Sequence, residues 1–370
     1  MEHLAKIDVP LYKRNKRSGK LFKRQQRNLK ASARALQSKA AVNKQFGESS
    51  KILSLLASGP ILKPSNAKGK VRFVAPSVFS LMENSAGVLS SIQGFVQSLR
   101  SHARVRDVHI DLSKVTHYDL GANGLIDVIV EEIMHKAKIT SRKIHWSGKY
   151  PSDPALRRFI KSMGVIKKIK LSKEYPEADE AARLSTYDDR CKNYVRAVRA
   201  SEVDKKNRVT AKFADHIDSC LKHIGRTLTH TAKSKLCKYV AEILDNAEEH
   251  AGMLDWTIQG YLDTHNAEWS VEIVIFNFGK SIAHTLSSLP DGSYTRDKSK
   301  PYINAHQRHG YFGVGQWREE DLLTLIALQQ GISSKNSTDA DTRGIGTVEL
   351  ISFFQTMCTQ LQAEGGVLGK

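Results

Sequence analysis

The sequence has few cysteines, and they follow no pattern that binds a metal ion or builds a disulfide framework. Neither a Cys-x-x-Cys pair nor the ligand spacing of a zinc finger occurs, which excludes the common structural zinc domains. Fourteen histidines likewise form no metal-binding signature. We therefore expect free thiols in a reducing compartment. The four cysteines are Cys191, Cys220, Cys237 and Cys358.

Long apolar runs are also absent. No segment approaches the length of a membrane-spanning helix, and the first residues contain no apolar signal core. We therefore expect a soluble, cytoplasmic protein with no membrane association. The chain has 370 residues, which is enough for about two domains with a hydrophobic core each.

Acidic residues are too few to balance the basic ones, so that the chain carries a formal net charge of +19. Residues 1–50 hold thirteen lysines and arginines against three acidic residues, and thus supply about half of that excess. The most basic part, residues 13–34, can bind nucleic acid or an acidic partner. The alternative is a solvated, partly helical tail.

A helix with chemistry on one face is predicted over residues 236–252. Glu242 and Asn246 lie one turn apart on a stripe that is distinct from the apolar one, so both can act on one ligand. A carboxylate can activate water, and an amide oxygen can hold Mg²⁺. An ordinary amphipathic helix with a solvated acidic face is the alternative. The apolar stripe comprises Leu236, Val240, Ile243, Leu244 and Ala247.

A β-hairpin is predicted next, from strands at 256–262 and 271–276 joined by a polar loop. The second strand breaks at Asn277-Phe278-Gly279, where glycine permits a ligand to approach the backbone. Lys280 follows, and its cation can bind phosphate or crowd the pocket. The alternative is a strand that simply ends in a turn.

A third segment, residues 342–354, places Gly344 and Gly346 before a predicted helix. Backbone N–H groups at a helix N-terminus suit phosphate oxygens, and glycines let those oxygens come close. Residues 331–341 are rich in Ser, Asn, Asp and Gly, which is typical of a mobile lid and equally of any exposed loop.

These three segments, in this order, resemble the N-box, G1 box and G2 box of the GHKL ATPases, the superfamily of gyrase-type ATPases, heat-shock chaperones and histidine kinases. The resemblance implies ATP and Mg²⁺ as cofactors. It makes Glu242 the general base and Asn246 the Mg²⁺ ligand. Two positions depart from the family pattern, because Asn277 replaces the adenine-binding aspartate and Ser281 replaces the second glycine. The implied nucleotide contacts are Asn246, Asn277, Gly279, Lys280, Gly344, Gly346 and Thr347.

Over residues 67–172, predicted strands at 71–75, 108–113 and 143–146 alternate with predicted helices at 87–99, 122–136 and 153–163. Asp153 is the predicted N-cap of the last helix. This alternation predicts a sheet covered by crossover helices. The segment 108–121 and the later stretches Gly-Lys-Tyr-Pro and Leu-Arg-Arg-Phe-Ile-Lys-Ser-Met-Gly resemble STAS domains, the anti-sigma-factor-antagonist fold. Family members that act as switches carry a Ser or Thr after the aspartate that opens a helix. Here Asp119 is followed by Leu-Gly-Ala, so we expect a module that docks a protein partner without being phosphorylated.

The predicted fold class is therefore α/β (α+β), a STAS-like domain followed by a GHKL-type α/β sandwich. We expect a basic, partly helical or disordered extension at 1–66 and the STAS-like domain at 67–172. A linker follows at 173–204, and the ATP-binding domain occupies 205–370, opening with a helix from about 207 to 230. Few residues follow the last predicted helix. The sheet can therefore be small with a bare edge, a partner can supply the final strands, or the chain can be truncated.

The function this predicts is that of a bacterial-type ATP-binding regulator, which hydrolyses Mg-ATP slowly or transfers phosphate to a protein partner. The combination resembles an anti-sigma kinase fused to its antagonist. A non-enzymatic docking protein with a degenerate ATPase fold and a nucleic-acid-associated ATPase that uses its basic arm are the alternatives. A homodimer is also compatible with the sequence.

Overall fold

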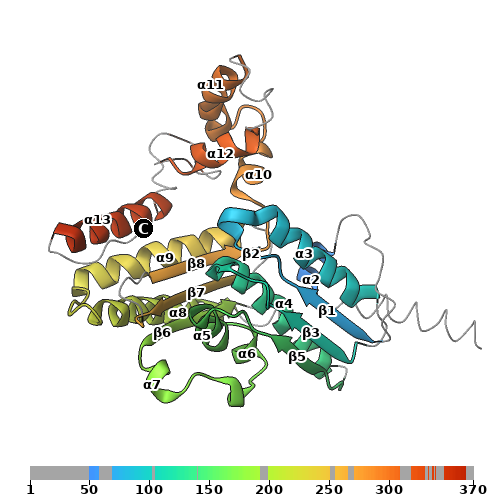
Figure 1. Cartoon of the computed structure of the whole chain (residues 1–370). Helices are drawn as coiled ribbons and strands as arrows, with labels where there is room; N and C mark the ends of the chain where they lie inside the picture. The colour runs from blue at the N-terminus through green and yellow to red at the C-terminus, as the bar shows by residue number, and fades with distance from the viewer. Residues whose placement is uncertain are drawn as a thin grey trace, which may run out of the picture.

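The computed structural model describes residues 50–57, 69–101, 105–139, 141–191, 199–250, 255–265, 271–308, 318–329 and 346–363, with 332, 336 and 338. The basic segment 13–34, Gly344 and most of the segment predicted as a lid lie outside the described residues. The described part is a mixed α/β structure in which helices predominate (Figure 1). Among the described helices, none is both long and apolar enough to cross a membrane.

The first sheet is parallel, with strand order β1-β3-β5. Its strands are β1 (Lys70–Val74), β3 (Asp107–Asp111) and β5 (His145–Lys149). These are the three strands predicted for the first half of the chain, and β5 begins two residues later than expected. A short parallel pair, β2 (Val78–Phe79) and β4 (His117–Tyr118), lies beside it.

Five helices accompany the parallel sheet, and three of them confirm the predicted alternation of strand and helix. They are α2 (Lys51–Leu56), α3 (Leu81–Ser101), α4 (Leu120–Ile139), α5 (Pro154–Met163) and α6 (Val165–Lys168). The predicted N-cap of α5 is confirmed, since the Asp153 carboxylate accepts a hydrogen bond from the Leu156 N–H at 2.8 Å. Apolar side chains such as Phe73, Val108 and Ile129 fill the core between these helices and the sheet.

The second sheet is antiparallel, with strand order β6-β7-β8. The predicted hairpin is confirmed by β7 (Trp256–Asp263) and β8 (Val271–Asn277), which pair without a register shift. The third strand, β6 (Leu184–Cys191), lies inside the segment 173–204 that was predicted as a linker, together with η1 (Ser172–Glu174) and α7 (Ala178–Ala181). The prediction missed β6 because three of its eight residues are charged, and the pattern therefore lacks clean apolar alternation.

Helices α8 (Arg199–Lys222), α9 (His230–His250) and α13 (Gly346–Ala363) share a core with this antiparallel sheet. The prediction that the helix before the N-box runs to His230 was wrong, because α8 ends at Lys222. Gly225 adopts a φ of 69° there, a left-handed conformation that breaks a helix. Three further helices, α10 (Ile282–Ser287), α11 (Tyr294–Arg308) and α12 (Glu319–Ala327), form a smaller group to one side (Figure 1).

Helix α4 is buried between the two sheets. It crosses the antiparallel sheet from β8 to β6, as three contacts show. At the start of α4, the Leu120 N–H donates to the Glu272 carboxylate on β8 at 3.2 Å. Further along the helix, Asp127 accepts from Gln259 on β7 at 3.2 Å. Glu131 then accepts from Arg190 on β6 at 3.0 Å. The two regions predicted as separate domains are therefore in direct contact through one apolar cluster that reaches Tyr261 and Phe278.

Buried His216 on α8 makes stability depend on pH. It is 7% exposed, and burial lowers its pKa from 6.5 to about 4. Because the folded protein holds this histidine neutral, protonation favours unfolding. We expect the free energy of unfolding to fall by about 3 kcal/mol as the pH drops from 6.5 through 4, and to level off below that.

Chemical denaturation at several pH values measures this loss. The glutamine of His216→Gln cannot be protonated, so this variant should lose this component of the pH dependence. The control is His223→Gln, an exposed position directly after α8, which should retain it. Identical pH profiles for the parent and His216→Gln would contradict the assignment.

Candidate functional site

The apolar stripe predicted for α9 is confirmed as the buried face of the helix, and Glu242 and Asn246 lie outside it. Leu236, Val240, Leu244 and Ala247 are buried against the antiparallel sheet, and Ile243 is half-buried. Asn246 is exposed and Glu242 is half-buried. Both side chains are thus placed where they can reach a ligand that lies on α9.

The C-terminal end of α9 and the end of β8 meet at the same end of the antiparallel sheet. Trp256 opens β7 and pairs with Asn277, the last residue of β8. The Trp256 indole N–H donates to the Glu248 carboxylate on α9 at 2.9 Å. Because Glu248 is only two residues from Asn246, the fold brings together the segments predicted as N-box and G1 box.

The turn after β8 is closed by Asn277 itself. Its side-chain oxygen accepts a hydrogen bond from the Gly279 N–H at 2.9 Å, while Lys280 is exposed. Phe278 is buried beside Phe276, with ring centroids 5.7 Å apart, and anchors the turn in the core that contains α4. The Asn277 oxygen has a second lone pair, so it can still accept from a ligand.

The third predicted segment begins α13, with Gly346 and Thr347 as its first residues. This helix packs on α9, where the rings of Tyr239 and Phe353 lie 6.3 Å apart in an edge-to-face arrangement. The stripe of α9 that contains Tyr239 and Glu242 therefore runs along the α9–α13 side of the domain. The N–H groups in the first turn of α13 have no intrahelical acceptor, which suits anion binding.

The donor set at α9 fits Mg²⁺ held chiefly by phosphate and water. Magnesium bound with a nucleotide commonly takes one or two protein oxygens and keeps several waters. Asn246 offers one such oxygen, and Glu242, one turn away on the same helix, is left to act as the base. Within the described residues, no group of three or more His, Cys, Asp or Glu could hold a metal ion without such help.

Comparison with known protein families, curated proteins and solved structures finds no match for this chain. The resemblance to GHKL ATPases and STAS domains therefore rests on the quoted motifs. In the region that resembles a STAS domain, Asp119 caps α4, because its carboxylate accepts from the Ala122 N–H at 2.7 Å and from the Met82 N–H at 3.3 Å.

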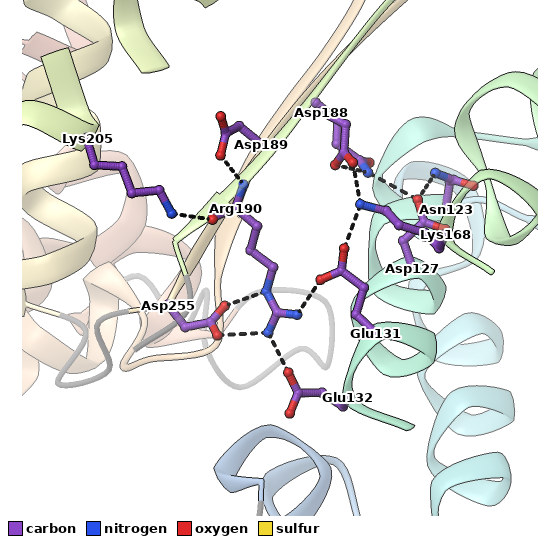
Figure 2. Close-up of polar contacts among 11 residues, drawn as sticks. Asn123, Asp127, Glu131, Glu132, Lys168, Asp188, Asp189, Arg190, Lys205 and Asp255 are labelled. Atoms are coloured by element: carbon purple, nitrogen blue, oxygen red, sulfur yellow. Dashed lines mark hydrogen bonds and ion pairs between the residues drawn. The ribbon is translucent and has the colours of Figure 1, made fainter. Parts of the chain in front are cut away.

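Sequence analysis missed a cluster of charged residues between α4 and the antiparallel sheet (Figure 2). At its centre is Arg190 on β6, whose side chain is 4% exposed. Its guanidinium group donates to Asp255 at 2.8 and 3.1 Å, to Glu131 at 3.0 Å and to Glu132 at 3.0 Å. Burial alone would lower the pKa of Arg190, but these carboxylates raise it above its usual range.

A second cation, Lys168 on α6, joins the same cluster. Its ammonium group donates to Glu131 at 2.8 Å and also contacts Asp188 on β6. Glu131 thus lies between Lys168 and Arg190 (Figure 2). Two features of the sequence could have indicated this cluster. One is the charged run Asp188-Asp189-Arg190 within a strand, and the other is the pair Asp127 and Glu131, one turn apart on a largely apolar helix.

Asp127 lies at the inner end of the cluster. Burial raises its pKa well above 3.8, and the positive charge of Lys168 opposes that effect in part. One of its oxygens accepts from Asn123 at 2.9 Å and from Gln259 at 3.2 Å. Its other oxygen and the Gln259 side-chain oxygen find no partner among the described residues. A carboxylic acid supplies a donor that a carboxylate lacks, which suits this pair of acceptors.

The polar contacts continue from α4 to α9. Asp255, which binds Arg190, directly precedes Trp256, and the Trp256 indole binds Glu248 on α9. Lys206 on α8 donates to Glu248 at 2.9 Å and also contacts Asp245, the residue before Asn246. The helix that carries the candidate nucleotide residues is therefore joined to α4 through hydrogen bonds and ion pairs on either side of the Asp255–Trp256 peptide bond.

Proposed function

We propose that this protein is a Mg-nucleotide-binding regulator of the GHKL type, in which residues 67–172 dock a protein partner. The supporting observation is that the end of α9 that carries Asn246 meets the end of β8 that carries Asn277, through the contact of Glu248 with Trp256. ATP fits this arrangement because a base, an amide ligand and a glycine-bearing turn then lie on adjoining segments.

In this proposal Asn246 would hold Mg²⁺, and Glu242 would accept the proton of the attacking water or protein hydroxyl. Asn277 and Gly279 contact the adenine, and Lys280 is free of the core and can reach phosphate. Gly346, Thr347 and the preceding Gly344 bind phosphate oxygens through backbone N–H groups. Slow hydrolysis and phosphate transfer to a partner both use these groups.

The contacts between α9 and α4 indicate how nucleotide binding would affect a partner. Phe278, directly after Asn277, packs in the core that contains α4, and Glu272 on β8 accepts from the first N–H of that helix. A ligand that shifts the Asn277 turn would therefore act on the N-terminus of α4, where Asp119 lies. Nucleic-acid binding by residues 13–34 and homodimer formation stay predictions.

Calorimetric titration of ATP with Mg²⁺ into the full chain tests the proposal. We expect saturable, Mg²⁺-dependent binding, weakened at least tenfold in Asn246→Ala because a metal ligand is lost. Asn304→Ala, which removes an exposed amide from α11, should bind as the parent does. A folded parent that does not bind Mg-ATP at millimolar concentration would overturn the proposal and leave the non-enzymatic docking function.

A further inference from the structure

A cavity of about 140 Å³ lies on the parallel sheet, away from the residues assigned to the nucleotide. Its floor is formed by β3 and β5 and the residues that follow them, among them Ile110, Leu112 and Trp146. The helices α5 and α6 and the turn η1 close it from the other side. It is thus bounded by five separate elements of the chain.

The cavity sits where ligands bind in many α/β proteins. Strands β3 and β5 are parallel neighbours, and the lining residues Leu112 and Tyr150 directly follow their last residues. The carboxyl ends of both strands therefore meet at this site. In open α/β sheets, the crevice outside the carboxyl ends of the strands is the usual place for a small ligand.

The volume of the cavity and its lining residues suit a small, largely apolar ligand. A single water needs about 10–15 Å³, whereas an apolar cavity of about 150 Å³ stays dry and accepts benzene. The cavity in this protein, at about 140 Å³, is close in volume to the one that accepts benzene. Besides the floor, Ile160, Val165 and Ile166 provide aliphatic walls, and Trp146 provides an aromatic surface.

One end of the cavity is polar. The Tyr150 hydroxyl donates to the Glu174 carboxylate at 3.1 Å, and both residues line the cavity. Lys161 lies 3.9 Å from the same carboxylate oxygen and 5.7 Å from the centre of the Tyr150 ring. A carboxylate has two oxygens with several acceptor positions, so that Glu174 can also accept from a ligand. Leu171 is exposed and the Glu174 side chain is partly exposed, so this end of the cavity opens to solvent.

We propose that this cavity binds a small, uncharged, single-ring molecule that carries one hydroxyl donor, with the ring against Trp146 and the hydroxyl on Glu174. The site requires no nucleotide and is independent of the function proposed above. Its ligand would act on the domain that contains α4, because α6 carries both a cavity wall and Lys168 of the charged cluster.

Phenol and benzene are suitable probes, because they differ only in the hydroxyl group. Titration of each into the full chain, followed by calorimetry and by protein NMR, should show saturable 1:1 binding, with phenol the tighter ligand. The variant Glu174→Ala should weaken phenol about tenfold and leave benzene unchanged, because only phenol loses a hydrogen bond.

Filling the cavity provides the second test. Ile166→Trp should abolish binding of both probes, whereas Ile282→Trp, at an exposed site on α10, should leave both unchanged. If Ile166→Trp does not fold, the affinities of Glu174→Ala for phenol and for benzene, compared with those of the parent, test the proposal instead. Absence of saturable binding to the folded parent, or equal phenol binding by the parent and Glu174→Ala, would overturn the proposal.

Discussion

Arg190→Ala is expected to lower the free energy of unfolding by about 3–5 kcal/mol, the range seen when one partner of a buried ion pair is removed. The reason is the burial of its partners. The side chains of Glu132 and Asp255 are 1% and 10% exposed, so their charges cannot be solvated once the guanidinium group is lost. Urea denaturation at pH 7 measures the effect.

Arg318→Ala is the matched control for this prediction. Its side chain is 80% exposed and lies 3.9 Å from Asp321. An exposed pair of this kind contributes less than about 1 kcal/mol. A loss of under about 1 kcal/mol for Arg190→Ala as well would mean that water reaches the cluster, and would contradict the burial described here.

A second property of the Arg190 variant follows from its position. Arg190 on β6 holds Glu131 and Glu132 of α4 against the antiparallel sheet, and Asp255 links it to Trp256 and α9. Its removal should therefore loosen the contact between the two sheets before either core unfolds. Hydrogen exchange at α4 and β6 would then rise above exchange in β1 and β3.

Glu242→Gln is expected to lower phosphate release, or phosphate transfer to a protein, by about 10²–10⁴-fold while Mg-ATP binding persists. Glutamine keeps the shape of the side chain and its oxygen, but it cannot accept the proton of the attacking nucleophile. Release of inorganic phosphate and transfer of γ-labelled phosphate should both be measured, since the same base serves either reaction.

Glu319→Gln, at an exposed position in the first turn of α12, controls for the loss of one negative charge. It should turn over as the parent does. Equal turnover by Glu242→Gln and the parent would remove Glu242 from its assigned role as general base. Nucleotide binding would then still be judged by the titration of Asn246→Ala.

Local patterns predicted much of the secondary structure. The stripe from Leu236 to Ala247 has the spacing of a helix, and it is the buried face of α9. The β-prone runs at 256–262 and 271–276, joined by a polar loop, predicted the hairpin β7–β8, and Asp153 marked the start of α5. These features follow from contacts between residues close in the chain, and such contacts leave a periodic signal.

The charged cluster could not be predicted in the same way. Arg190 is separated from Glu131 by 59 residues and from Asp255 by 65, so that no local spacing connects them. In sequence, Asp-Asp-Arg within β6 is typical of an exposed turn rather than a buried strand. Its charges became compatible with burial only because α4 supplies carboxylates at the matching positions.

The sequence by itself determined the alternation of strands and helices, the face that α9 buries and the identity of the candidate nucleotide residues. Only the tertiary structure decided that β6 completes the second sheet, that α4 is enclosed between both sheets, and that the pKa of Asp127 is raised by burial. The physical reason is that periodicity and turn chemistry act over a few residues. The partner and the ionisation state of a buried charge depend on groups brought together from distant parts of the chain.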